Sequence, residues 1–71
     1  MNLNAIFEPA EEGGYIAWLA EMPGVQTQGE TLAEAKDNLR EALELSLEYL
    51  RERAQREASA SSVLEPFDLA V

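Results

Sequence analysis

The chain contains no cysteine and no histidine among its 71 residues, and its only lysine is Lys36. Without cysteine it forms neither a disulfide nor a thiolate metal site, and without histidine it lacks the most common general base and metal ligand. These absences exclude Ser-His and Cys-His catalysis, and a lone lysine leaves no supported Schiff-base arrangement. We therefore expect a protein that is not an enzyme and that binds no cofactor or metal ion.

Basic side chains are also scarce, because 5 Lys and Arg residues stand against 14 Asp and Glu residues, a formal net charge of −9. Such a chain repels a phosphate backbone, so direct nucleic-acid binding is not expected. A small basic protein is the more natural partner, since opposite charges steer association. The alternative is that the charge only keeps the domain soluble. No basic leader, long apolar run or lipidation motif is visible, so the expected location is the cytoplasm, away from membranes.

The length predicts a single domain, residues 1–71, with a thin core. Chains below about 70–80 residues seldom gain more than about 3–5 kcal/mol from one core, and this chain has no disulfide to add to that. We therefore expect a homo-oligomer, most simply a homodimer.

Three short strands are predicted in the first part of the chain, at residues 2–7, 15–20 and 25–28. The first alternates apolar and polar residues, the second is apolar on both faces, and the third follows the Pro23-Gly24 turn. If Phe7 lies opposite Tyr15 in a hairpin, the chain divides its apolar side chains between two faces of the sheet.

A helix is predicted from Thr31, which forms a capping box with Glu34. The helix should end within residues 55–62, where the apolar periodicity is lost. A fourth strand is then predicted in residues 63–71, with Pro66 confining part of it to a sheet edge. The apolar stripe that should pack on the sheet consists of Leu32, Ala35, Leu39, Ala42, Leu43, Ser46 and Leu50.

The predicted fold class is therefore α+β, with two layers and the element order β-β-β-α-β. A meander followed by a helix that returns the last strand beside the first gives a four-stranded sheet of order 3-2-1-4, with one helix on one face.

The candidate partner or oligomer interface consists of five apolar residues. Ile6, Ile16 and Trp18 should share the sheet face turned away from the helix, a composition typical of protein-protein patches. The alternative is that Trp18 is an ordinary core aromatic. Leu45 and Tyr49 lie on one flank of the helical stripe, either as a second contact site or as a half-covered helix edge.

Three motifs in Gly13–Leu50 resemble the HicB antitoxin family: GGY opening a strand, EMPG at the following turn, and TQGET leading into the helix. The family more often has proline where this chain has Ala20. The resemblance implies a partial RNase H-like fold and the neutralisation of a small basic HicA-like toxin that cleaves RNA. HicB proteins commonly carry a DNA-binding domain as well, but the residues after the helix are needed for the fourth strand, so none is expected here.

Two other functions remain as alternatives. One is a solitary oligomeric binding module of unknown ligand. The other is a metal-dependent nuclease of degenerate RNase H-like type, for which Glu65 and Asp68 near the last strand are the candidate ligands. The second is disfavoured because the first strand offers no internal carboxylate and the helix carboxylates lie on the solvent side.

Overall fold

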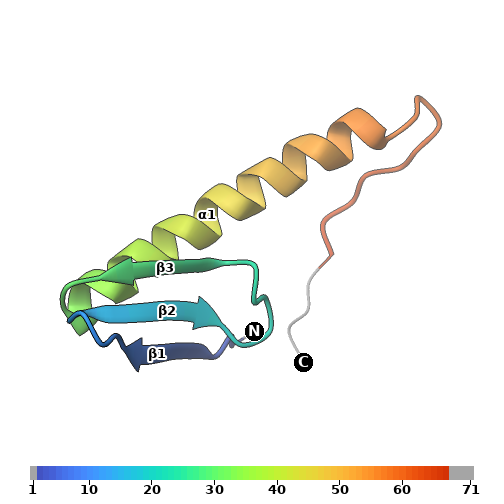
Figure 1. Ribbon diagram of the computed structural model, residues 1–71. Helices are drawn as coiled ribbons and strands as arrows, with labels where there is room; N and C mark the ends of the chain where they lie inside the picture. Colours follow the sequence, from blue (N-terminus) through green and yellow to red (C-terminus); the bar gives the residue numbers. More distant parts are fainter. Residues whose placement is uncertain (1, 68–71) are drawn as a thin grey trace.

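The computed structural model describes residues 2–67, which form three strands followed by one long helix. The strands form one antiparallel sheet in the order β1-β2-β3, and α1 lies along one face of it (Figure 1). This agrees with the predicted α+β class and with a helix on one side of the sheet. The elements are β1 at Ala5–Pro9, β2 at Tyr15–Leu19, β3 at Gln26–Gly29 and α1 at Leu32–Glu57.

The predicted fourth strand is wrong for the residues that the structure describes. Residues 58–67 follow α1 without regular secondary structure, so the fold is β-β-β-α and not a four-stranded sheet of order 3-2-1-4. The side chains of Val63 and Phe67 are exposed. Apolar composition alone does not make a strand, because a strand also needs a neighbour to pair its backbone groups. Leu69 and Val71, also assigned to this strand, lie outside the described residues.

The β1–β2 hairpin differs from the prediction in register but not in the faces of its side chains. Phe7 lies opposite Ala17, whereas the sequence suggested Tyr15. The connection is compact because Gly13 and Gly14 adopt positive φ values of 99° and 76°, a region that suits glycine. Side chains alternate with a period of two, so a shift of two residues leaves each of them on its predicted face.

The helix begins as predicted at its capping box. The Oγ1 atom of Thr31 accepts a hydrogen bond from the backbone N–H of Glu34 at 3.1 Å. The Glu34 carboxylate accepts in return from the backbone N–H of Glu30, at 3.4 Å, one residue before the expected partner. Together these contacts satisfy donors at the helix start and fix where the chain leaves β3.

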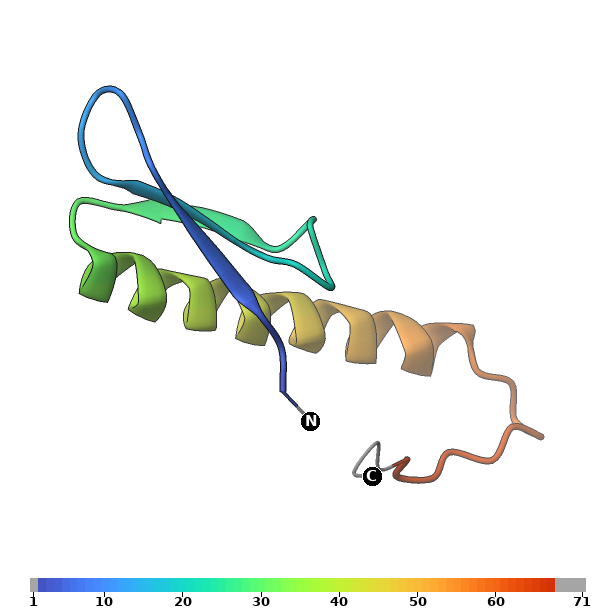
Figure 2. The same ribbon diagram turned by 90° about the horizontal axis from the view of Figure 1, so that it is seen from below.

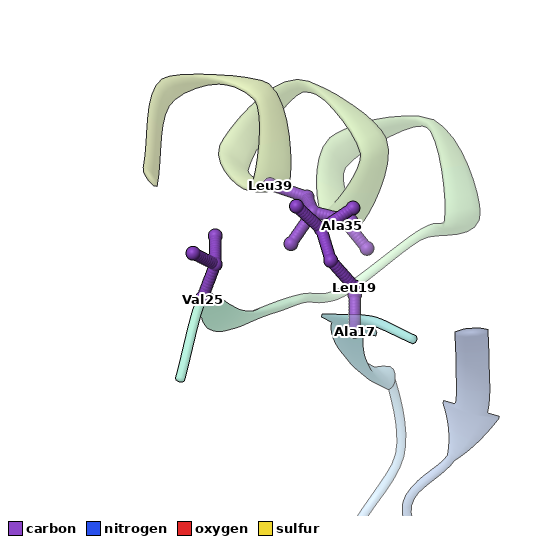
Figure 3. Packing of buried hydrophobic residues seen from close by; sticks show 5 residues of the cluster. All are labelled: Ala17, Leu19, Val25, Ala35 and Leu39. Atoms are coloured by element: carbon purple, nitrogen blue, oxygen red, sulfur yellow. The ribbon is translucent and has the colours of Figure 1, made fainter. Parts of the chain in front are cut away.

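A small hydrophobic core lies between the sheet and α1 (Figure 3). Its members come from β2, from the turn before β3 and from the first half of the helix. The core therefore lies between the central strand of the sheet and the start of α1. Half-buried side chains, including Phe7 and Tyr15, pack around it. The buried core residues are Ala17, Leu19, Val25, Ala35 and Leu39.

The helix is much longer than the sheet that it covers. It has 26 residues, or about 39 Å at 1.5 Å per residue, whereas strands of five residues span about 17 Å. Figure 2 shows the second half of α1 extending beyond the strands. Of the predicted stripe, Ala35 and Leu39 are buried, while Leu32 and Leu50 at its two ends are exposed. The three stripe residues between Leu39 and Leu50 are half-buried, namely Ala42, Leu43 and Ser46.

The acidic residue of the EMPG motif, Glu21, connects the turn between β2 and β3 to the residue just before β1, in a contact that we call the Glu21 clamp. The Glu21 carboxylate accepts hydrogen bonds from the backbone N–H and from the side-chain amide of Asn4, each at 2.8 Å. The backbone bond, followed by the side-chain bond, lowers the pKa of Glu21 below its ordinary value. The chain just before β1 is thus held in line with the sheet.

Candidate functional site

The sheet face turned away from α1 carries an apolar cluster, which we call the outer face. Ile6 lies directly opposite Trp18 across the β1–β2 pair, and Ile16 lies two residues before Trp18 on the same side of β2. The structure thus brings together three of the five residues predicted for an interface. Side chains opposite one another on one sheet face are close enough to act as a unit.

Polar side chains border the cluster on both sides. On β1, Glu8 lies opposite Ile16; on β3, Gln26 and Gln28 lie opposite Trp18 and Ile16. The alternation of these glutamines with Val25 and Thr27 is typical of a strand at a sheet edge. Their position beside the tryptophan follows from the register, which no local pattern contains.

The outer face is accessible rather than part of the core. Ile6 is 39% exposed and Ile16 is 41% exposed, while Trp18 is half-buried between its neighbours. Trp18 is therefore not one of the five buried core residues, and the register places it beside Ile6 on the outer face. A half-buried tryptophan with apolar neighbours and a polar rim has the composition of a contact patch.

An acidic groove adjoins this face at one end of the sheet. It is lined by the β1–β2 loop, the end of β3 and the start of α1, and it shares Glu8, Ile16 and Gln28 with the outer face. The remaining carboxylates are too exposed to hold a desolvated ligand, and their charge acts through the solvent as a negative field. They are Glu11, Glu12, Glu30 and Glu34.

The other two predicted interface residues lie on a different surface. Leu45 and Tyr49 are 60% and 57% exposed on α1, where the helix leaves the sheet. With Met22 and Val25 from the β2–β3 turn they line a shallow apolar groove on the helix side of the sheet. The five residues therefore belong to two separate surfaces and do not form one site.

No metal-binding constellation is found in residues 2–67, where no group of three or more His, Cys, Asp and Glu side chains converges. Glu65 is exposed in the segment after α1. Asp68, the other acid named for a nuclease site, lies outside the described residues. Within the same range, α1 lacks the uninterrupted apolar length of a membrane-spanning helix.

Comparison with known sequences places these features in a family. A family model described as UPF0150-like matches residues 3–57, which include all three strands and the whole of α1. Two proteins of Synechocystis sp. (strain ATCC 27184 / PCC 6803 / Kazusa) are similar to this chain. UPF0150 protein ssl0738 is 44% identical over 68 residues, covering 90% of this chain and 94% of the relative. UPF0150 protein ssr1765 is 31% identical over 70 residues, covering 99% of this chain and 89% of the relative. The chain belongs to the UPF0150-like family.

Proposed function

We propose that this chain is an antitoxin-type binding protein of the HicB-like kind, whose outer face engages a small basic protein. The binding partner that fits this role is a HicA-like toxin that cleaves RNA. Membership of the UPF0150-like family is compatible with this function, since that family is related to HicB-like antitoxins.

The observation that carries the proposal is the outer face itself. Trp18, Ile6 and Ile16 form an accessible apolar centre, with Gln26 and Gln28 as polar groups at its rim. Tryptophan is among the residues most enriched at the energetic centres of protein interfaces. A partner that covers this cluster removes its apolar surface from water while the glutamines hydrogen-bond at the edge.

The charge distribution selects the kind of partner. The acidic groove continues from the outer face, and the whole chain carries a formal net charge of −9. A basic protein is drawn toward that end of the sheet, and its association should slow as salt screens the attraction. Covering an RNA-cleaving toxin would block its access to RNA without any chemistry from this chain.

The proposal is tested with the purified chain and a HicA-like toxin, to be sought as a short basic protein encoded in a reading frame next to its gene. Isothermal titration should show a complex, and the chain should suppress RNA cleavage in proportion to complex formed. Trp18→Ser should raise the Kd by about 30-fold or more, because a central interface aromatic contributes about 2 kcal/mol or more. Gln26→Arg should also weaken binding by placing a positive charge on the rim, and it leaves the fold undisturbed because this side chain is exposed.

Tyr49→Ser is the matched control, since it removes an exposed aromatic side chain from the helix surface instead of the outer face. It should leave the Kd unchanged within about twofold, the usual effect of a residue outside the contact. The antitoxin role is refuted if the chain neither binds nor inhibits the basic protein. Equal affinity for wild type, Trp18→Ser and Gln26→Arg would refute the outer face as the binding surface.

A further inference from the structure

The free edge of β1 carries unpaired backbone groups. The backbone N–H of Ala20 donates to the carbonyl of Asn4 at 2.8 Å. This bond shows which residues of the β1 segment direct their backbone groups toward β2. Backbone groups in an antiparallel pair point alternately toward and away from the neighbouring strand. Those of Leu3, Ala5 and Phe7 therefore point away from β2, and β1 has no second strand beside it within residues 2–67. An uncovered edge of this kind is a template for another strand.

The opposite edge of the sheet is partly occupied. On β3 the backbone groups of Gln26 and Gln28 face outward, because the N–H of Leu19 donates to the carbonyl of Val25 at 3.2 Å. The side-chain amide of Asn38, on α1, donates to the Gln28 carbonyl at 2.9 Å. The helix also packs chiefly against β3 and β2 (Figure 1). The two edges are thus unequal, and among the described residues β1 is the open one.

Charge favours the same edge for contact between identical chains. With a net charge of −9, two copies repel each other at most orientations. Residues 1–7 contain no charged side chain, and the first acidic residue is Glu8. The β1 edge is therefore a place where a second copy can approach closely without bringing carboxylates together.

Apolar side chains also lie beside this edge. Leu3 and Phe7 are half-buried against the margin of the core, on the helix side of the sheet. A strand added at this edge would cover that margin. The Glu21 clamp on Asn4 keeps the chain before β1 extended, which is the shape that strand pairing requires.

From these observations we infer that β1 pairs antiparallel with β1 of a second copy, forming a continuous six-stranded sheet across a twofold axis at Ala5. In this register Leu3 of one copy lies opposite Phe7 of the other, and all outward N–H groups from residue 3 to residue 7 find carbonyl partners. Pro9, which has no N–H, falls beyond the paired residues. Glu8 faces Asn2 of the second copy, so no two carboxylates meet. The two outer faces then adjoin and double the apolar surface.

The experiment compares two proline variants of the full chain. Ala5→Pro removes an N–H that points away from β2, so the fold keeps its own ladder while the proposed pairing loses its central bonds. Gln26→Pro is the matched control, because it removes an outward N–H from the other edge strand. Light scattering should give twice 7.9 kDa for wild type and Gln26→Pro, and 7.9 kDa for Ala5→Pro. The dimer Kd should rise by about 100-fold or more in Ala5→Pro, because two hydrogen bonds are lost and two backbone carbonyls are left without a donor.

Hydrogen exchange provides a test that needs no variant. The amides of Leu3 and Phe7 should exchange slowly in wild type, and faster as the protein is diluted, while that of Gln26 exchanges fast throughout. A one-chain mass for wild type at micromolar concentration overturns the proposal. A dimer that persists in Ala5→Pro overturns it too, and so does slow exchange of Leu3 and Phe7 that dilution does not change. The protein is tested alone, so failure here leaves the proposed function open, and failure of toxin binding leaves the dimer open.

Discussion

The substitution Gly29→Ala tests how closely β3 approaches the helix. A Cβ atom built at Gly29 lies 2.5 Å from the backbone N of Ala35, 2.8 Å from its Cα and 3.0 Å from the carbonyl carbon of Glu34. Ordinary contacts between such atoms are about 3.5–4.0 Å, so the added methyl group overlaps the helix by about 1 Å. All three atoms belong to the backbone of α1, and no flexible side chain can move aside.

The expected cost follows from that geometry. Overpacking of a well-packed site costs typically about 1–3 kcal/mol, and here the strain falls on a backbone contact next to the buried Ala35. We expect a loss of about 2 kcal/mol in the free energy of unfolding. For a domain of this size that corresponds to a fall in Tm of about 8–16 °C.

The assay is thermal unfolding followed by far-ultraviolet circular dichroism, at one protein concentration for all variants. Gly24→Ala is the control, since a Cβ atom at Gly24 meets nothing within 4 Å and its φ is not positive. It should match wild type or gain up to about 1 kcal/mol from a less flexible unfolded chain. If the Gly29→Ala and Gly24→Ala variants melt at the same temperature, the close contact with the backbone of α1 does not restrict the size of the side chain at position 29.

Three further predictions concern the helix and the Glu21 clamp. Thr31→Ala should lose about 1 kcal/mol of unfolding free energy, because the cap hydrogen bond to the N–H of Glu34 disappears, and Thr31→Ser should recover most of it. In urea titrations Leu39→Ala should cost about 2–4 kcal/mol by leaving a cavity in the core, whereas the exposed Leu45→Ala should stay within about 0.5 kcal/mol. The pKa of Glu21 is lower in the folded chain than its ordinary value of 4.5, so its stabilising effect is present above that pH and is lost as the pH falls through the folded pKa. The Tm difference between wild type and Glu21→Gln should accordingly be seen at pH 7 and vanish in acid; a constant difference would contradict the role of the carboxylate.

The sequence by itself determined the local structure and the faces of each element. Strand alternation separated Ile6, Ile16 and Trp18 from the core, and this survived an error of two residues in the register because the side-chain period is two. The start of the helix followed from the capping box of Thr31, and the core residues Ala35 and Leu39 followed from helical spacing. These features depend on a few neighbouring residues, so the printed sequence contains most of what decides them.

The tertiary structure alone decided which segments meet. Residues 63–67 have strand-like composition and still form no strand, because pairing depends on a distant neighbour and not on propensity. The separation of Leu45 and Tyr49 from the outer face, the clamp between Glu21 and Asn4, and the close approach at Gly29 are likewise long-range contacts. The first and the last depend on the angle and length of α1 relative to a shorter sheet, whereas the clamp depends on the pairing of β1 with β2. No single window of the sequence encodes either relation.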